Sequence, residues 1–241
     1  MLLEVNNLTK KYKARKRGSK EIIAVDNFNL KLVEGETVGI IGPSGCGKST
    51  TARMIAGLIK PTSGNVMFNN KDILKAKRKD LLNIRKDMQI IFQHPQQRFN
   101  PKKKIYDIMA EAIRLHSLSS IIEEEKKMVY DAIDRVGITK DQVFKYPSEI
   151  SGGQAQRIAI ARVLLLDPKL IIADEPTSML DISVQAQILS TIKDIQNENN
   201  LAMIFISHDI DVVNAMCKRV ISMKDGKIVK EELLEEKIHI S

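Results

Sequence analysis

The sequence predicts an α/β protein built on a largely parallel β-sheet, with a helical subdomain inserted into the α/β core. Short apolar runs that are typical of buried strands alternate with helical patterns along most of the chain, which favours parallel strands joined by helices. Between about residues 95 and 166 the strand-like runs are absent and helical spacing takes over, which indicates the inserted subdomain.

Each element follows from a local pattern. The apolar runs predict buried strands at Thr37–Ile41, Met88–Phe92, Leu170–Ala173 and Ala202–Ile206. Helices are predicted after strands at Lys48–Leu58, Ser183–Glu198 and Asp209–Met216. A more antiparallel portion is expected from Leu2–Val5, Phe28–Val33 and Arg219–Val229. In the helical subdomain, helical spacing covers Ile105–Leu115, Ile121–Val136 and Gln154–Leu165, and the acidic run Glu123–Glu125 suits a helix N-terminus.

Length and composition indicate a soluble protein with a substantial core. The chain has 241 residues, of which 43% are hydrophobic and 28% charged. Its longest apolar stretches are far shorter than the roughly 18 residues that a membrane span needs. The N-terminus, which carries Glu4 and Asn6, lacks the apolar core of a secretory signal. A cytoplasmic protein is therefore expected.

The formal net charge of +8 is open to three interpretations: nucleic-acid binding, contact with an anionic membrane surface, and plain solvation. Of these, we prefer plain solvation, in which the charges lie on solvated faces and loops. Aromatic residues make up only 4% of the chain and tryptophan is absent, so stacking platforms for nucleic acid are few and no nucleic-acid partner is expected. The two cysteines, Cys46 and Cys217, lack metal-ligand spacing and are expected to be reduced and structural.

A phosphate-binding loop is predicted at residues 42–49. The run GPSGCGKS fits the pattern G-x-x-x-x-G-K-[ST], with a predicted strand before it and a helix after it. Glycines let backbone N–H groups approach phosphates closely, and the following helix directs its N-terminus at the anion. Lys48 is expected to reach the β- and γ-phosphates and the Ser49 hydroxyl to ligate Mg²⁺. The predicted ATP-binding residues of this segment are Gly42, Pro43, Ser44, Gly45, Cys46, Gly47, Lys48, Ser49 and Thr50.

Two adjacent acids end a predicted buried strand. In Leu170–Glu175 (LIIADE), Asp174 and Glu175 lie at the carboxyl end of the strand, where open α/β sheets bind ligands. Asp174 is expected to hold Mg²⁺ through a water molecule, and Glu175 to polarise an attacking water as a general base.

The run ISGGQAQR, residues 150–157, resembles the signature motif of ABC (ATP-binding cassette) ATPases. Physically, the start of a helix rich in small residues offers an anion site made of backbone N–H groups. The resemblance covers essentially the whole chain and implies a P-loop NTPase fold with a RecA-like core, an antiparallel β subdomain and a helical subdomain. It implies that residues 1–241 form a single ABC ATPase domain. The signature residues are Ser151, Gly152, Gly153 and Gln154.

The other markers of the family follow in the family's order. Tyr12 resembles the aromatic residue that stacks on adenine, and Gln93 resembles the Q-loop glutamine at the Mg²⁺ and water site. Residues 178–181 resemble the D-loop, with Met179 where alanine is usual and Asp181 retained. His208 resembles the switch histidine that contacts the γ-phosphate. The implied catalytic residues are Glu175, His208 and Gln93, and the implied Mg²⁺ ligands are Ser49, Gln93 and Asp174.

The resemblance also implies partners. In this family the signature motif of one subunit closes on the nucleotide of another, so two ATP molecules are sandwiched in a head-to-tail dimer. The expected partners are a second ATP-binding subunit, in a homodimer or, by preference, a heterodimer with a related chain, a transmembrane permease that docks at the Q-loop and the helical region, and an extracytoplasmic solute-binding protein. The chain itself is then expected at the cytoplasmic face of the membrane.

Two further segments resemble the peptide/nickel importer branch of the family. They are FQHPQQRFNP, residues 92–101, and DISVQAQI, residues 181–188. His94 stands where that branch often has aspartate and is expected to be an exposed loop residue. Because the chain ends without the long tail of many peptide ATPases, nickel or another chelated transition metal is the preferred solute and oligopeptides are the alternative. A soluble ABC ATPase of iron–sulfur assembly or of a nucleic-acid-linked process is the alternative from another class.

Overall fold

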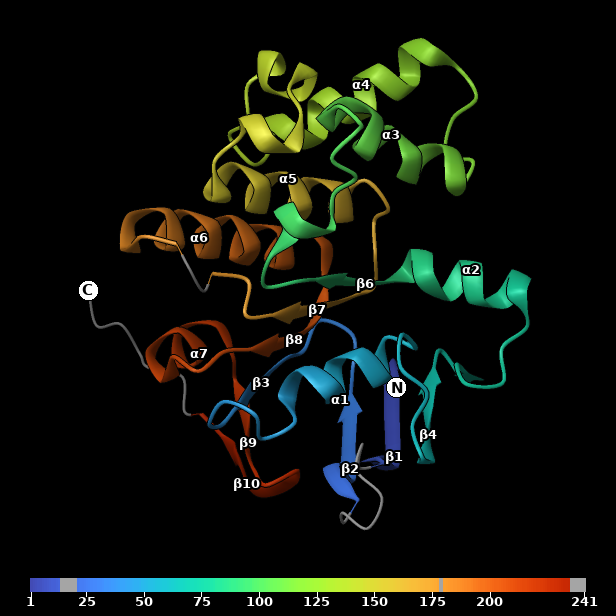
Figure 1. Ribbon diagram of the computed structural model, residues 1–241, viewed down its shortest axis with the longest axis vertical. Coiled ribbons are helices and arrows are strands. Elements are labelled where there is room, and N and C mark those ends of the chain that lie inside the picture. The colour runs from blue at the N-terminus through green and yellow to red at the C-terminus, as the bar shows by residue number, and fades with distance from the viewer. Residues whose placement is uncertain (14–20, 178–179, 235–241) are drawn as a thin grey trace.

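The computed structural model describes residues 1–13, 21–177 and 180–234, arranged around two β-sheets (Figure 1). The smaller sheet is antiparallel, in the order β2 (Ile22–Leu32), β1 (Leu3–Tyr12), β4 (Ser63–Phe68), β5 (Lys71–Asp72). The larger sheet has the order β10 (Lys227–Leu233), β9 (Arg219–Lys224), β3 (Thr37–Ile41), β8 (Ala202–Ile206), β7 (Leu170–Asp174), β6 (Met88–Ile91). Its strands from β9 to β6 run parallel and β10 pairs antiparallel to β9.

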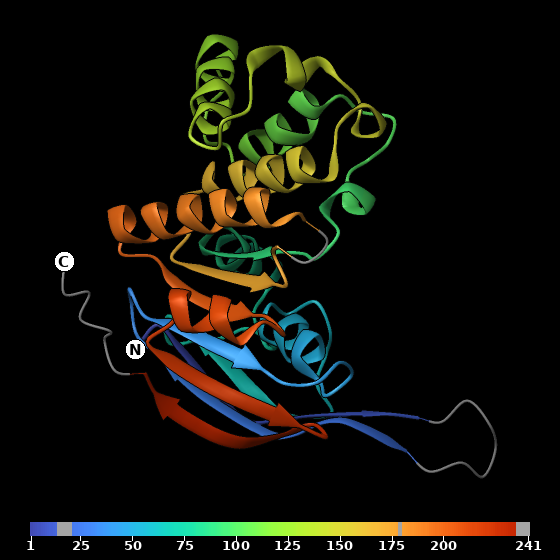
Figure 2. The ribbon, with the colours of Figure 1, turned by 90° about the vertical axis from the view of Figure 1, so that its left-hand side faces the viewer.

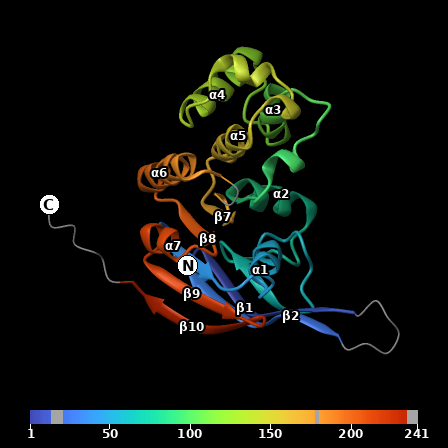
Figure 3. The ribbon, with the colours of Figure 1, turned by 60° about the vertical axis from the view of Figure 1, so that its left-hand side comes forward.

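The helices form distinct groups around these sheets. They are α1 (Lys48–Ile55), α2 (Arg78–Asp87), α3 (Ile105–Leu115), α4 (Ile122–Asp134), α5 (Gly152–Leu164), α6 (Ile182–Asn199) and α7 (Ile210–Met216). Short 3₁₀ turns lie at η1 (Pro95–Arg98), η2 (Lys140–Phe144) and η3 (Pro147–Glu149). Figure 3 shows α3, α4 and α5 stacked on the side of the larger sheet that faces away from β1 and β2.

Alternate residues of the central strands supply two cores. In β7, Ile171 and Ala173 pack into a cluster with residues of α3–α7, whereas Leu170 and Ile172 pack into a second cluster with α1 and the antiparallel sheet. Successive side chains of a strand point to opposite faces, so a strand covered on both faces must be apolar at every position. This explains why these strands read as continuous apolar runs in the sequence.

The predicted fold class is confirmed, with one strand wrongly assigned. Arg219–Val229 is two strands, not one, because Asp225 and Gly226 form a tight turn with φ values of 49° and 80°. The first of these strands, β9, pairs parallel to β3 in the larger sheet rather than joining the antiparallel sheet. We propose that residues 1–241 form one ATPase domain in which about residues 95–166 are the helical subdomain.

Several element boundaries differ from the sequence prediction. Helix α1 ends at Ile55 rather than Leu58, because Gly57 adopts φ 66° and its N–H and that of Leu58 bond back to the last turn. Strands β1 and β2 extend to Tyr12 and from Ile22, and they project together from the body of the molecule (Figure 2). The sequence prediction missed β4, β5 and α2. Of the ten residues in α2 only Ile84 is buried, so that helix has almost no apolar face to recognise.

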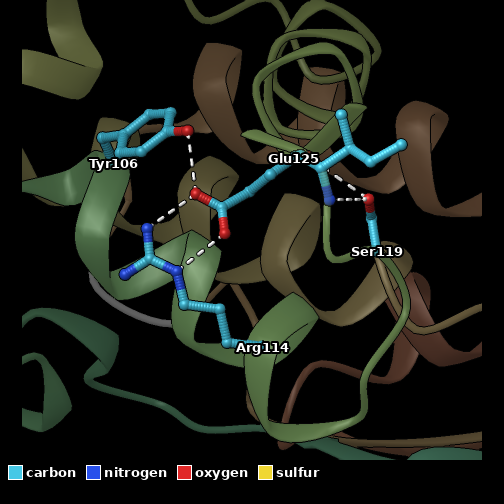
Figure 4. Close-up of polar contacts among 5 residues, drawn as sticks. Tyr106, Arg114, Ser119 and Glu125 are labelled. Atoms are coloured by element: carbon cyan, nitrogen blue, oxygen red, sulfur yellow. Dashed lines mark hydrogen bonds and ion pairs between the residues drawn. The ribbon is translucent and has the colours of Figure 1, made fainter. Parts of the chain in front are cut away.

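An ion pair between exposed Arg114 and buried Glu125 joins α3 to α4 (Figure 4). Glu125, only 6% exposed, accepts hydrogen bonds from Arg114 Nε and Nη2, both at 2.7 Å, and from the Tyr106 hydroxyl at 3.0 Å. The Arg114 guanidinium holds the pKa of Glu125 below its usual value. Burial, together with the neighbouring carboxylate, raises the pKa of Tyr106 to about 12.

Glu125→Gln is expected to destabilise the protein by about 1–2 kcal/mol at neutral pH, because it removes a charge-assisted pair whose arginine is partly solvated. A lowered carboxyl pKa stabilises the fold above the unfolded value of 4.5 and ceases to do so as the pH falls through the folded value. The difference in unfolding free energy between wild type and variant should therefore shrink below about pH 4.5. Denaturant titrations at pH 7 and pH 4 measure this, with exposed Glu123→Gln as the control. A difference that does not change with pH would contradict the assigned cause.

Candidate active site

The loop between β3 and α1 needs glycine at two positions where its backbone lies close to the backbone of a neighbouring strand. Gly42 and Gly47 have φ values of 150° and 110°. A Cβ on Gly42 would lie 2.2 Å from the Met223 carbonyl oxygen, and one on Gly47 would lie 2.3 Å from that of Ala24. Neither position accepts a side chain. The loop is therefore held tightly against β2 and β9, with α1 beginning at Lys48 directly behind it.

Lys48 lies inside the loop. Its side chain is 6% exposed, and its amino group donates hydrogen bonds to the carbonyl oxygens of Gly42 at 2.7 Å and Pro43 at 3.1 Å. These contacts hold an ammonium group beside the N-terminus of α1, where two positive potentials add. Such a position suits the binding of an anion with several negative charges.

The next side chain connects the loop to the distant acid of β7. Ser49 Oγ donates a hydrogen bond to Asp174 Oδ1 at 2.9 Å, although the two residues are 125 positions apart. Asp174 is 3% exposed, and burial raises its pKa. A hydroxyl and a carboxylate oxygen side by side are hard oxygen ligands that fit Mg²⁺, which takes only a few protein ligands and completes its shell with water and phosphate oxygens.

Glu175 begins the segment after β7 in the left-handed region, with φ 50°. Its backbone N–H donates to the Ile206 carbonyl at 3.0 Å, which fixes it at the end of the sheet. Its Oε2 accepts a hydrogen bond from Gln93 Nε2 at 2.8 Å and lies 3.6 Å from His208 Nδ1. Gln93 after β6 and His208 after β8 thus both lie against the carboxylate of Glu175 after β7. This carboxylate can accept a proton from a water molecule.

These groups, except Asp174, which is not among the lining residues, open onto one cleft of about 600 Å³, a volume suited to a small-molecule ligand. The cleft combines backbone of the glycine-rich loop with charged and polar side chains. Its lining residues are Ala24, Ser44, Gly45, Gly47, Lys48, Ser49, Thr50, Gln93, Glu175 and His208. The sequence reasoning missed Ala24, which has no chemical signature because β2 contributes it through its backbone position beside Gly47.

Other predicted site residues lie away from this lining. Gly42, Pro43 and Cys46 belong to the loop, but they do not line the cleft. Tyr12 lies at the end of β1, 40% exposed, with the Lys10 amino group 5.1 Å from its ring centre. His94 was expected to be exposed, which is wrong: it is half-buried where the chain enters η1.

The signature residues begin α5 and do not line the cleft. Ser151 is the N-cap: its Oγ accepts from Gln154 N at 3.2 Å, and its own N–H donates to Gln154 Oε1 at 2.9 Å. Gly152 is exposed, and a Cβ there would meet nothing within 4 Å. The start of α5 therefore presents backbone N–H groups to the surrounding space.

Asp181 caps α6 in a similar way. It accepts from Val184 N at 3.0 Å and from the Ser183 hydroxyl at 2.6 Å, and these hydrogen bonds lower its pKa. The predicted D-loop residues Ser178 and Met179 lie outside the described residues. In the described part of the chain, no group of three or more His, Cys, Asp and Glu side chains is placed to bind a metal ion.

Comparison with known proteins places this geometry in a family. A family model described as ABC transporter matches residues 25–178. The chain belongs to the ABC family. It is an ATPase coupled to transport, with the cassette fold of that family. Among the described residues of this ABC ATPase, no helix combines the length and the apolar character that a membrane span requires.

Several relatives of this ABC ATPase are named for oligopeptide transport. The oligopeptide transport ATP-binding protein OppF of Bacillus subtilis (strain 168) is 42% identical over 243 residues, which cover 99% of this chain and 79% of the relative. OppF of Escherichia coli (strain K12) is 44% identical over 220 residues, covering 91% of this chain and 66% of the relative. AppF of Bacillus subtilis is 40% identical over 247 residues, covering 99% and 75%.

Solved ABC cassettes share the fold. The dimeric cassette MJ0796, in a post-hydrolysis state bound to ADP and Pi, has a TM-score of 0.86 and 34% identity, covering 97% of this chain and 99% of that one. The cassette cbiO1 of Clostridium perfringens, part of the transporter complex cbiONQ, has a TM-score of 0.79 and 31% identity, covering 96% and 88%.

Proposed function

We propose that this ABC ATPase is the motor subunit of an importer that takes up oligopeptides. The single observation that supports this solute most strongly is the 42% identity to OppF of Bacillus subtilis across 99% of the chain. The sequence alone favoured nickel, and these relatives support the peptide alternative instead. The preference for nickel depended on where the sequence ends, which carries no information about a solute that this subunit does not touch.

The residues that line the cleft, together with Tyr12 and Asp174 outside its lining, are assigned the following roles. Lys48 and the N–H groups of the loop bind the β- and γ-phosphates of ATP, and Tyr12 stacks on adenine. Ser49, Asp174 and Gln93 hold Mg²⁺, which neutralises charge on the phosphates. Glu175 accepts the proton of the attacking water, and His208 contacts the γ-phosphate. The Glu175 contacts with Gln93 and His208 support this, because the three side chains lie together among the residues that line the cleft.

The position of the signature residues supports a two-cassette assembly. Ser151–Gln154 do not line the chain's own cleft, and Gly152 in the first turn of α5 is exposed, with nothing within 4 Å of where a Cβ would lie. We assign this segment to the nucleotide of a second ATP-binding subunit, either a copy of this chain or a related one, with Asp181 at the same interface. The solved relative MJ0796 is dimeric, which is in keeping with this assembly.

A groove beside the Q-loop is the proposed docking site of the permease. It has a volume of about 490 Å³ and lies between the ends of α2 and β6 on one side and η1, α3 and α5 on the other. Phe92, Phe99 and Leu115 give it an apolar floor, while Arg98 covers the Phe92 ring at 4.5 Å. An apolar helix of a transmembrane partner fits such a groove. The ATPase then lies at the cytoplasmic face of the membrane and works with a solute-binding protein outside the cell.

Uptake by whole cells separates the candidate solutes. A strain that lacks this gene is complemented with the wild-type gene and offered labelled di- and oligopeptides, and separately labelled nickel with and without a chelator. We expect the gene to restore peptide uptake and to leave nickel uptake unchanged. Restored nickel uptake alone would overturn the solute assignment. If neither solute responds, a soluble ABC ATPase of iron–sulfur assembly or of a nucleic-acid-linked process takes its place.

A further inference from the structure

The 3₁₀ turn η1 connects the Q-loop to the segment before the signature helix. It begins two residues after Gln93. Its half-buried residue Gln96 directs its side-chain amide at η3, the turn that precedes α5. Gln96 Nε2 donates hydrogen bonds to the carbonyl oxygens of Pro147, at 2.7 Å, and Ile150, at 3.4 Å. The contact with Pro147 is a short hydrogen bond, and the contact with Ile150 is near the longest distance that a hydrogen bond allows. One amide group therefore joins η1 to the first residue of η3 and to the residue that follows η3.

The segment that receives these hydrogen bonds is held by local hydrogen bonds and by burial. Tyr146 N donates to Glu149 Oε2 at 2.7 Å, which closes a capping box around η3. Ile150 is 6% exposed and belongs to the same buried cluster as Phe99, the residue that follows η1. Ser151, the next residue, caps α5. A shift of η1 relative to the core should therefore carry residues 147–151 with it rather than deform them.

We propose that Gln96 is a positioning residue that holds the signature segment in register with the Q-loop glutamine. Gln93 contacts Glu175 at 2.8 Å, so the same short stretch of chain is bonded to the candidate base at one end and to the signature segment at the other. This rests on the proposed assignment of Ser151–Gln154 to the nucleotide of a second subunit. It is independent of the transported solute.

The chemistry explains why an amide is needed at this position. The two acceptors are neutral carbonyl oxygens, so the side chain must supply N–H donors and carry no negative charge. Leucine would match the size of glutamine without donating. Glutamate would set a carboxylate against two carbonyl oxygens, and only its protonated form could donate one hydrogen bond. The neighbouring Gln97 is exposed, which makes it a matched control.

The test compares Gln96→Leu, Gln96→Glu and Gln97→Ala in the full-length chain. Affinity for a fluorescent ATP analogue is measured on the monomer, steady-state hydrolysis gives kcat and KM, and ATP-driven dimerisation is measured by light scattering in a Glu175→Gln background. We expect Gln96→Leu to lower kcat and to weaken dimerisation by about tenfold each, while monomer affinity for ATP stays within twofold of wild type. Gln97→Ala should behave as wild type throughout.

The glutamate variant supplies a second readout. Its kcat relative to wild type should rise as the pH falls from 7 to 5, toward the ordinary titration range of a glutamate, because protonation restores one donor and removes the repelling charge. Dimerisation and kcat in Gln96→Leu that equal those of Gln97→Ala would overturn the proposal. It would also be overturned if ATP affinity and thermal stability fell in parallel with kcat, because Gln96 would then only stabilise the fold. Neither result would bear on peptide uptake, so the proposed function stands or falls separately.

Discussion

Replacing Glu175 with Gln is expected to lower the turnover of ATP by about a thousandfold, which is the usual range for losing a general base. The amide keeps the shape of the side chain and can still contact Gln93, but it cannot accept a proton from water. ATP binding should remain, because Lys48 and the loop are unchanged. The variant should therefore accumulate as a closed dimer with ATP bound, since closure is driven by the γ-phosphate and reopening needs hydrolysis.

Phosphate release and size-exclusion chromatography with ATP measure the two parts of this prediction. Asp131→Asn, a charge-matched change at an exposed position on α4, is the control and should leave both measurements as in wild type. Robust steady-state hydrolysis by Glu175→Gln would remove Glu175 as the base. Loss of ATP binding together with turnover would instead mean that Glu175 shapes the cleft.

Lys48→Ala is expected to weaken ATP binding by about 30–150-fold, which corresponds to about 2–3 kcal/mol for charge-assisted hydrogen bonds to phosphate. The ammonium group lies within the loop, 2.7 Å from the Gly42 carbonyl, so its loss removes the positive charge nearest the phosphates. Lys48→Arg should not restore binding. Its guanidinium is larger and planar, and it cannot occupy the position of a compact ammonium between two loop carbonyls.

Equilibrium binding of a fluorescent ATP analogue measures this effect directly. The exposed Lys79→Ala on α2 carries the same change in net charge and is expected to bind as wild type does. An unchanged affinity in Lys48→Ala would count against the assignment of residues 42–49 to the phosphates. A loss that high salt abolishes would indicate long-range electrostatics rather than direct contact.

The parts of the fold that the sequence predicts well are those where burial leaves a local pattern. Strands β3 and β8 have the predicted bounds because both faces of each are covered and, Thr37 apart, their residues form a continuous apolar run. Helix α2 is missed because it buries only Ile84, and the β9–β10 hairpin is missed because a two-residue turn at Asp225 interrupts an otherwise strand-like run. Tertiary context decides these elements.

The site residues also differ in whether a local sequence pattern predicts them. The loop around Lys48 and the acids Asp174 and Glu175 stand out locally, since each lies at the end of an apolar strand. A local sequence pattern does not predict contacts between residues that are distant in the sequence. Gln93 and Glu175 are 82 positions apart, and Ser49 and Asp174 are 125 apart. The shared Mg²⁺ role of Ser49 and Asp174 was expected from the loop and the strand-end acids, whereas Gln93 was placed at the site only through resemblance to a family. The hydrogen bonds of Gln96 had no sequence signal at all, because glutamine is equally common on solvated surfaces.

The solute was the weakest part of the sequence prediction, for a physical reason. None of the cleft residues contacts the transported molecule in the proposed assembly, so this chain's chemistry is the same whether the importer carries a peptide or a metal chelate. Identity to oligopeptide transport proteins over nearly the whole chain is what supports the peptide proposal.

The measurement that tests the central claim most directly is phosphate release by the assembled transporter. The complex is purified from membranes through a tag on this chain, reconstituted in proteoliposomes, and assayed with the solute-binding protein alone and loaded with an oligopeptide. We predict that the peptide-loaded protein raises the rate several-fold, that chelated nickel does not, and that Glu175→Gln abolishes both basal and stimulated release. A rate that is indifferent to peptide, or that survives in Glu175→Gln, would contradict the account.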